Sequence, residues 1–235
     1  MSAGALSGRG VLVTGGASGL GAATVELLTR RGDEVVVLDR QPLPPEVDAK
    51  WVEVDLADPR AAEEAVDAAR EALGRRFDAV VAAAGVDACG PFADVPAQLW
   101  ERVIAVNLLG TVAVVRAAWP DLARDNGRVV LVASTLGLRA LPDATAYCAS
   151  KFGVLGFARA LAAESGGRPA VTCLLPGGMA TPFFDGRPEQ YRPGPDAALN
   201  DPRNVARAVA FAIDQPPGCE VRELLVCPTQ ESSWP

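Results

Sequence analysis

Short apolar segments alternate along the chain with longer segments whose apolar residues recur at helical spacing. Runs of strand length occur at 10–16, 34–39, 50–56, 77–85, 127–134, 170–178 and 221–228. Segments with helical spacing lie between them, at 20–31, 60–73, about 96–124, 146–165 and 201–214. Strands that are apolar throughout and alternate with helices are typical of a parallel sheet covered on both faces. The pattern therefore predicts one doubly wound, Rossmann-type α/β domain over 1–235, with about seven strands.

One long stretch, 177–201, has neither period and is rich in proline, glycine and aspartate. A loop of that length inside a compact domain is usually a lid, a binding loop or disordered. We expect a substrate-binding loop over about 178–200.

Composition narrows the class of protein. Hydrophobic residues make up 49% of the 235 residues, and the net charge of −7 argues against general affinity for nucleic acid or anionic membranes. The first 16 residues lack the features of a signal peptide, and no apolar run approaches the roughly 20 residues of a membrane span. The expected location is cytoplasmic.

The five cysteines form no close pair, and there is no histidine, so no metal site is expected. We expect the thiols to be buried and free.

Glycines are concentrated between the first strand and the first helix, in TGGASGLG at 14–21. Gly15, Gly19 and Gly21 would let the backbone approach a pyrophosphate, which then lies on the amides and the positive end of a helix. By itself the cluster also fits a plain strand–helix turn.

Asp39 ends the second predicted strand, about 20 residues further on, where a carboxylate can accept hydrogen bonds from both hydroxyls of an adenine ribose. Its charge would repel a 2′-phosphate, which favours NAD over NADP. Two alternatives remain open: Arg40 could pair with that phosphate, and Asp39 could be an ordinary turn residue.

The chain has only two tyrosines and two lysines, and one of each, Tyr147 and Lys151, lie four residues apart on a predicted helix. Side chains at that spacing share a helix face. A nearby ammonium lowers the pKa of a phenol, so the pair could do acid–base work without a histidine. A chance surface pair is the alternative, although 20 of the 22 basic residues are arginine, which makes this lysine notable.

Ser134 follows the fifth predicted strand. Ligands of open α/β sheets bind beyond the carboxyl ends of the strands, so its hydroxyl could bind a substrate carbonyl. A turn at the strand end would explain the serine equally well.

Taken together, TGGASGLG, Asn107, Ser134, Tyr147-x-x-x-Lys151 and LLPGG at 174–178 resemble the classical short-chain dehydrogenase/reductase family. The resemblance runs from about Gly8 to Pro182. It implies an NAD(P)-dependent oxidoreductase that interconverts a secondary alcohol and a ketone. Tyr147 would exchange the proton, Ser134 would orient the substrate oxygen, Lys151 would bind the nicotinamide ribose, and Asn107, in a distorted helix, would hold a water of the proton relay.

The resemblance also implies the cofactor-binding residues, which are Thr14, Gly15, Ser18, Gly19, Leu20, Gly21, Asp39, Arg40, Asp55, Leu56, Ala84, Gly85, Tyr147, Lys151, Pro176, Gly177 and Thr181. One departure is Ala83, where the family usually has an asparagine that bridges to a neighbouring strand. The loss of this asparagine bears on the rigidity of the loop after the fourth strand more than on the catalytic chemistry.

The expected substrate-binding residues are Ser134, Leu136, Leu141, Tyr147, Gly178, Phe183 and Phe184, with Val86, Asp87, Leu138, Met179 and Tyr191 as further candidates. Most are apolar, which suggests a small to medium, largely apolar alcohol or ketone, or only a lid packed onto the domain. Alternatives are an NADP-dependent ketoreductase, a nucleotide-binding sensor without turnover, and an epimerase or dehydratase on the same fold. Family resemblance further implies a dimer or tetramer.

Overall fold

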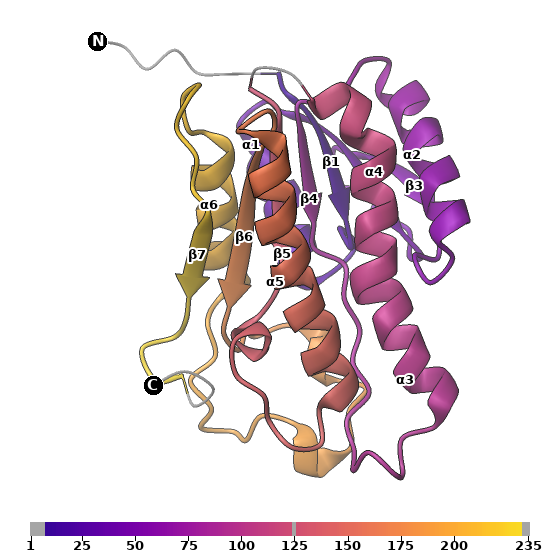
Figure 1. Cartoon of the computed structure of the whole chain (residues 1–235), viewed down its shortest axis with the longest axis vertical. Helices are drawn as coiled ribbons and strands as arrows, with labels where there is room; N and C mark the ends of the chain where they lie inside the picture. Colours follow the sequence, from indigo (N-terminus) through magenta and orange to yellow (C-terminus); the bar gives the residue numbers. More distant parts are fainter. Residues whose placement is uncertain (1–7, 124–125, 232–235) are drawn as a thin grey trace.

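The computed structural model describes residues 8–123 and 126–231 and contains one seven-stranded parallel sheet (Figure 1). Its strands are β1 (Gly10–Thr14), β2 (Glu34–Asp39), β3 (Lys50–Glu53), β4 (Ala79–Ala82), β5 (Arg128–Val132), β6 (Ala170–Pro176) and β7 (Glu223–Val226). They are ordered β3-β2-β1-β4-β5-β6-β7. The predicted doubly wound fold is confirmed.

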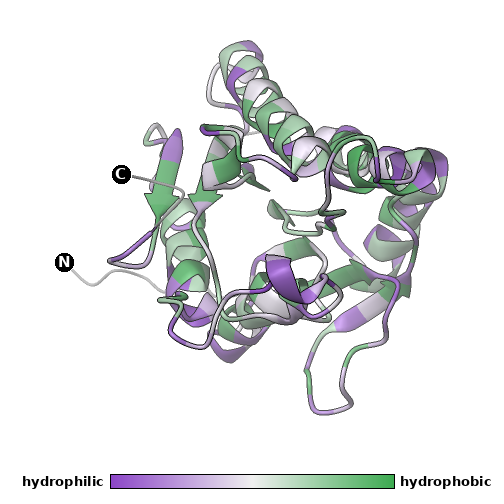
Figure 2. Cartoon of the chain, turned by 90° about the horizontal axis from the view of Figure 1, so that it is seen from below, coloured by the Kyte–Doolittle hydropathy of each residue, from purple (hydrophilic) through white to green (hydrophobic). Residues whose placement is uncertain are grey.

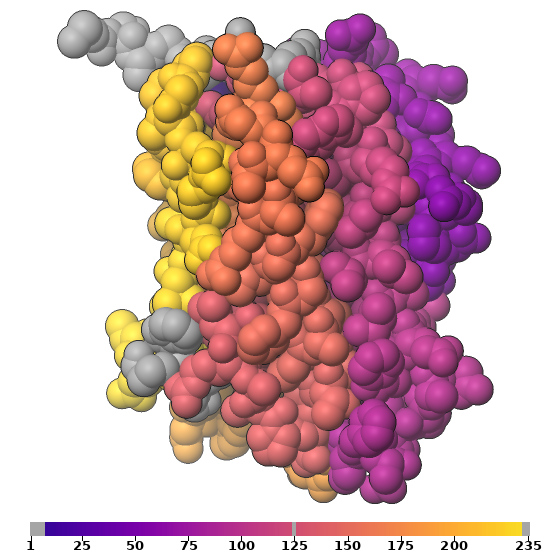
Figure 3. Space-filling view, viewed as in Figure 1, coloured from indigo at the N-terminus to yellow at the C-terminus, as the bar shows by residue number. Residues whose placement is uncertain are grey.

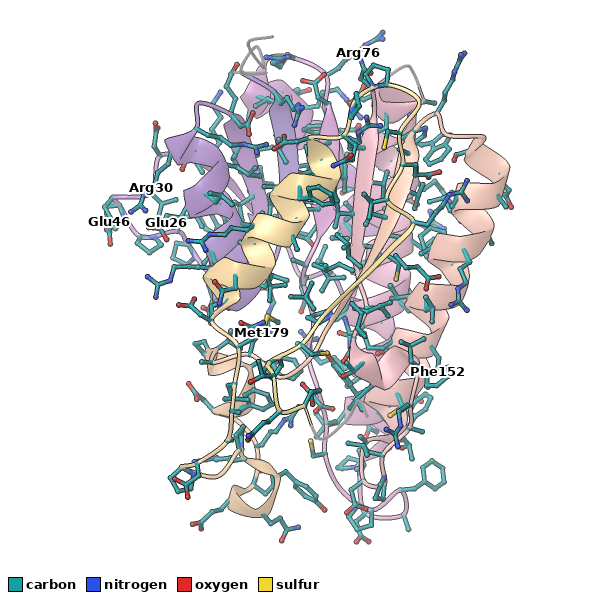
Figure 4. The ribbon with its side chains drawn as sticks, turned by 90° about the vertical axis from the view of Figure 1, so that its left-hand side faces the viewer. Glu26, Arg30, Glu46, Arg76, Phe152 and Met179 are labelled. Carbon is teal, nitrogen blue, oxygen red and sulfur yellow. The ribbon has the colours of Figure 1, made fainter. Side chains whose placement is uncertain are left out.

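Helices cover both faces of the sheet. They are α1 (Gly19–Arg30), α2 (Pro59–Leu73), α3 (Ala97–Ile104), α4 (Thr111–Leu122), α5 (Thr145–Ser165) and α6 (Pro202–Ile213). One apolar core joins the sheet to α2, α4 and α5, and a second joins the other face to α1 and α6. Figure 4 shows α6 crossing the face opposite α5, and Figure 3 shows α4 and α5 side by side on the first face.

The helix boundaries follow from local chemistry. Asp58 accepts hydrogen bonds from the first-turn amides of α2, Pro59 occupies the first position, and Gly74 ends the helix with φ of 75°. Asp201 and Pro202 begin α6 in the same way. An Asp-Pro pair therefore begins both helices where the apolar period starts.

The helix expected at about 96–124 is interrupted. A π-helical turn, Ala105–Gly110, separates α3 from α4, and the predicted end at Arg124 lies outside the described residues. By length and composition alone, the segment Ala97–Leu122 could cross a membrane, but half of its most apolar part is buried inside the fold. Packing against the sheet, α2 and α5 accounts for this apolar character.

The order in which strands are added reverses at β1: β2 and β3 lie on one side of it, and β4, the next strand in the sequence, lies on the other. This topological switch point opens a crevice beyond the carboxyl ends of the strands, where ligands of such folds bind. The arrowheads in Figure 1 point to that end, and the loop at 177–201 crosses it. Figure 2 looks onto the same end and shows hydrophobic and hydrophilic loop segments lying together.

Candidate active site

A cavity of about 1120 Å³ lies along this end of the sheet, from the glycine-rich turn to the loop at 178–200. It is lined by nearly all the residues expected to bind cofactor or substrate; Thr14 lies just behind the lining, completely buried. The sequence-predicted residues therefore converge on one site.

The glycine-rich turn brings β1 and α1 very close together. Gly15 has φ of 71° and Gly19 has φ of 55°, conformations that favour glycine. A Cβ atom on Gly21 would lie 2.0 Å from the carbonyl oxygen of Gly15. The Thr14 hydroxyl accepts a hydrogen bond from the Ala84 amide at 3.1 Å, so β4 is tied to β1 even with Ala83 in place of the family's usual asparagine. The start of α1 is thus left open to a phosphate.

Asp39 lies at the rim of the same cavity. Its carboxylate accepts hydrogen bonds from the amides of Ala17 and Gln41, each at 3.0 Å. The Ala17 contact holds the acidic side chain against the glycine-rich turn, where a ribose next to the pyrophosphate would lie. The geometry fits the predicted ribose-binding role.

Asp55 is engaged by a residue that the sequence did not point to. Arg102 Nη2 lies 2.9 and 3.1 Å from its two carboxylate oxygens, and Arg40 lies 4.0 Å away. Burial raises the pKa of Asp55, but the Ala57 amide and Arg102 outweigh it and hold the pKa below its ordinary value. Asp55 is therefore a carboxylate, and Arg102 limits its movement beside the expected adenine position.

Asn107 lies in the π-helical turn and is completely buried. Its side chain donates to the Val86 carbonyl at 2.9 Å and to Ser150 Oγ at 3.0 Å, and it accepts from the Val86 amide at 2.8 Å. Through these three hydrogen bonds the side-chain amide of Asn107 ties the loop after β4 to α5. The predicted helix distortion is present, and the side chain itself acts as a structural link.

Lys151 is buried, with its ammonium 2.8 Å from the Val132 carbonyl oxygen and 5.5 Å from the centre of the Tyr147 ring. The two side chains face each other, as the helical spacing predicts. Burial lowers the pKa of Lys151 to about 8. The ammonium is therefore close to the phenol but costly to keep charged.

The expected effect of this lysine on the phenol is not found in the structure. Burial raises the pKa of Tyr147 above its ordinary value, and the opposing contributions, a hydrogen bond with Ser134 and the charge of Arg187, are smaller. The expectation of a lowered pKa was wrong because it considered the neighbouring charge and not desolvation. The Ser134–Tyr147 hydrogen bond places both hydroxyls at one point of the cavity.

At the other end of the nucleotide site, the segment after β6 is closed by the C-terminal tail. Glu231 accepts a hydrogen bond from the Gly178 amide at 2.7 Å and lies so close that a Cβ on Gly177 would be 2.1 Å from its carboxylate oxygen. Thr181 lies over Gly19, 3.4 Å from where a Cβ would be. No sequence pattern pointed to Glu231, because only the fold brings the tail back to this loop.

The substrate end combines apolar walls with an ion pair. Leu136, Leu141, Phe183 and Phe184 line the cavity as predicted, and the Phe183 ring centre lies 5.6 Å from that of Tyr147. Arg187, which the sequence did not single out, pairs with Asp87 at 2.6 Å.

The cysteines contribute no metal site: within residues 8–123 and 126–231, no three metal-ligating side chains come together. Cys148 and Cys173 are buried as expected, but Cys219 is exposed and Cys89 and Cys227 are only partly buried. The expectation of buried thiols was therefore too broad, because Cys89, Cys219 and Cys227 lie in loops outside the helices and strands.

A glycine-rich turn at a switch point, an acid held against that turn and a Ser–Tyr–Lys cluster are the features of an NAD(P)-dependent oxidoreductase of the Rossmann type. The sequence matches the short chain dehydrogenase family over residues 9–192, and the chain belongs to that family.

Similar proteins agree with this class. The chain is 34% identical to glycine betaine reductase ATRR of Emericella nidulans over 97% of its own length, but it spans only 19% of that longer protein. It is 36% identical to D-threitol dehydrogenase of Mycolicibacterium smegmatis, covering 69% of this chain and 66% of that one. A short chain dehydrogenase from Burkholderia cenocepacia, solved in complex with NADP, has a TM-score of 0.81 and 26% identity, covering 95% of this chain and 98% of the other.

Proposed function

We propose that the protein interconverts a secondary alcohol and a ketone with NAD as the hydride carrier. The observation that carries this proposal is that Ser134, Tyr147 and Lys151 line the nucleotide cavity together, with Ser134 hydrogen-bonded to Tyr147 and the Lys151 ammonium 5.5 Å from the centre of the Tyr147 ring. A related protein named D-threitol dehydrogenase supports oxidation at a carbinol carbon.

The residues present fit a dinucleotide. Gly15, Gly19 and the first turn of α1 would hold the pyrophosphate, Asp39 the adenine ribose, and Lys151 the nicotinamide ribose. When bound, the oxidised nicotinamide supplies a hydride acceptor and a positive charge. That charge acts in the direction of the phenolate, against the burial that raises the pKa of Tyr147.

The protein's own part in the reaction is positioning and proton transfer. Ser134 holds the substrate oxygen within reach of the Tyr147 oxygen. In oxidation the Tyr147 phenolate takes up the proton of the substrate hydroxyl, and in reduction the phenol donates it to the carbonyl oxygen. Lys151 keeps a positive charge one helical turn away, and the buried Asn107 fixes the loop around it.

Preference for NAD is argued from Asp39. Its carboxylate is held on the glycine-rich turn by the Ala17 amide, so a 2′-phosphate would meet a fixed like charge. Arg40 favours the second candidate, NADP, because its side chain is 57% exposed and its ion pair with Asp55 is long, at 4.0 Å, so the guanidinium can turn toward that phosphate. The Burkholderia relative was solved with NADP, so both nucleotides belong in the test.

The substrate we propose is small to medium and largely apolar. Phe183, Phe184, Leu136 and Leu141 form the walls next to the reacting hydroxyls.

The proposal is tested by a screen of secondary alcohols and ketones against all four forms of the nicotinamide nucleotides, read by absorbance of the reduced form. We expect turnover with NAD exceeding that with NADP. Binding of NAD without turnover on any substrate would support a sensor, and substrate alteration without net nucleotide change would support epimerisation or dehydration.

A further inference from the structure

The lid, defined as residues 178–200, is held at its base by backbone pairing. Ala180 donates to the Asn200 carbonyl at 2.9 Å, and the Asn200 amide donates to the Gly178 carbonyl at 2.9 Å. Met179, labelled in Figure 4, lies at this base below α6. These hydrogen bonds fix only the base of the lid. The rest of the lid is held over the cavity by contacts of its own side chains.

The far part of the lid is held by an ion pair to the loop after β4. Arg187 Nη2 lies 2.6 Å from Asp87 Oδ2, and these side chains are only 18% and 5% exposed. Asp87 is itself fixed, because its carboxylate accepts from the Ala88 amide at 2.7 Å and from the Cys89 thiol at 3.1 Å. The Coulomb attraction within a pair this buried and this short exceeds that of an exposed pair, in which water screens the charges, and breaking it by removing one partner leaves the other charge buried and unpaired.

The same guanidinium connects the ion pair to the reacting phenol. Its central carbon lies 5.0 Å from the ring centre of Phe183 and 4.6 Å from that of Phe184. Phe183 in turn contacts the Tyr147 ring at 5.6 Å between centres. The contacts therefore run without a break from Asp87 through Arg187 and Phe183 to Tyr147.

We propose that Arg187, anchored by Asp87, is a positioning residue for the reaction: it closes the lid and presses Phe183 against the ring of Tyr147. Neither charged residue exchanges a proton with substrate. The inference rests on the proposed role of Tyr147 and deepens it, because it names what holds that side chain in place.

Within the part of the chain that the structure describes, the Arg187 guanidinium leaves one N–H group without a hydrogen bond, which weakens its hold on the closed lid. Among the described residues, Arg187 Nε is buried without a hydrogen-bond acceptor, so only one strong bond joins the arginine to Asp87. A buried unpaired donor is unfavourable, which offsets part of the stabilisation from the ion pair. The lid can thus open to exchange ligands while still favouring the closed position.

The pH dependence of the reaction distinguishes this proposal from a purely structural role, which would leave the pKa of Tyr147 unchanged. The charge of Asp87 raises the pKa of Tyr147 and the charge of Arg187 lowers it. The other titratable groups near the phenol are Cys148 on the same helix and Lys151 one turn away, and neither is altered by changes in the lid. Removing one partner at a time should therefore move the pH dependence in opposite directions.

The test compares Asp87→Asn, Arg187→Met and the double variant, with Arg116→Met on the exposed side of α4 as the control. For oxidation, the rise of kcat/KM with pH should shift to lower pH in D87N and to higher pH in R187M. It should return close to the wild-type position in the double variant. The kcat of R187M should fall roughly 10- to 100-fold, since small displacements of a catalytic group have effects of that size.

A second measurement needs no turnover and follows the lid itself. Cys89 lies under the lid, bonded to Asp87, whereas Cys219 is exposed and serves as an internal reference. Alkylation of Cys89, followed by mass spectrometry over a range of pH and expressed per thiolate, should become at least about tenfold faster in R187M, because an open lid exposes a partly buried thiol. The rate per thiolate is compared because loss of the Arg187 charge raises the pKa of Cys89. Cys219 should be unaffected.

The outcomes separate the two ideas. Shifts in the same direction for D87N and R187M, or no shift together with unaltered Cys89 alkylation, would overturn the positioning role. Loss of turnover on every substrate with Cys89 still protected by Arg187 would instead reject the proposed function and leave the closed lid established. If R187M fails to fold, D87N, which keeps the size of the side chain, still decides the direction of the shift.

Discussion

Asp39 and Lys151 show how far the surroundings of single residues decide their chemistry. Asp39 is fixed on the glycine-rich turn by backbone amides, and its charge is available to a ribose. Lys151 is a cation held in the core by one carbonyl, so its charge comes at a cost in stability. Each leads to a prediction that needs no knowledge of the substrate.

Replacing Asp39 should change the nucleotide preference. In Asp39→Ser, kcat/KM with NAD should fall about 10- to 100-fold, the loss expected for hydrogen bonds to a charged group, and that with NADP should rise. Asp39→Asn is the matched control, because it keeps an acceptor for the Ala17 amide and removes only the charge. If the ratio of NAD to NADP use stays constant in both variants, Asp39 does not select the nucleotide.

Lys151 should make stability depend on pH in a defined window. Burial lowers its pKa to about 8 in the fold, from the ordinary value of 10.5 that a lysine has in an unfolded chain. Below pH 8 both states carry the proton and the folded state bears the full cost, on the order of 3 kcal/mol. Between pH 8 and 10.5 the unfolded chain binds more protons, so stability rises with pH, and above that range the cost is gone.

Lys151→Met should therefore unfold at no lower temperature than the wild type at pH 7, and the difference between them should shrink toward pH 10. Taking the difference cancels the thiols and tyrosines that titrate in the same range. Lys50→Met, the same change at the exposed second lysine, is the control. A Lys151→Met variant that is much less stable at pH 7 would show that the Val132 contact outweighs desolvation.

Elements set the geometry of the site through close backbone contacts. The first turn of α1 packs against the end of β1 at Gly21. The π-helical turn carries Asn107 and ends at Gly110, where an added Cβ would lie 2.5 Å from the Leu56 carbonyl oxygen. Such positions leave no room for a side chain and fix how helix ends face the crevice.

Gly21→Ala should damage the nucleotide site by pushing α1 away from β1. An added Cβ would lie 2.0 Å from the Gly15 oxygen, so the backbone must shift, which typically costs about 1–3 kcal/mol. We expect a lower melting temperature and at least about tenfold weaker NAD binding by calorimetry. Gly156→Ala, in α5 with nothing within 4 Å, is the control and should stabilise the helix by roughly 0.5–1 kcal/mol.

At the scale of the whole molecule, exposed apolar side chains suggest self-association. Leu99, Leu109 and Phe152 are 50%, 47% and 44% exposed on α3, the π-helical turn and α5, and Phe152 stands out from its helix in Figure 4. We propose that this face is a contact between copies of the chain, in line with the resemblance to a family of dimers and tetramers.

Leu109→Gln combined with Phe152→Gln should then shift the protein toward the monomer at micromolar concentration, as measured by light scattering, without lowering its melting temperature. Phe211→Gln, on α6 at the opposite face, tests whether the effect is specific to the first surface. A wild-type protein that is monomeric at every concentration would remove this proposal.

The fold and the central residues of the site could be predicted because they depend on local pattern and strand order. Apolar runs located every strand, and the switch-point rule placed Ser134, Tyr147 and the glycine-rich turn at one end of the sheet. Arg187, Arg102 and Glu231 could not be predicted, since their partners are set by loop conformations and by contacts distant in sequence. The prediction of a lowered pKa for Tyr147 failed for another reason. The shift of this pKa is a balance of opposing effects, and its direction depends on burial, which the sequence does not give.

The central claim is that the Tyr147 hydroxyl exchanges the proton of the substrate oxygen beside bound nucleotide. The most direct measurement is kcat of Tyr147→Phe on the best substrate of the screen, with NAD affinity determined in parallel. The account predicts a loss of about 100-fold or more in kcat for Tyr147→Phe, the size expected for a general acid–base group, with NAD bound as tightly as by the wild type. A Tyr147→Phe variant that retains the wild-type kcat would contradict it.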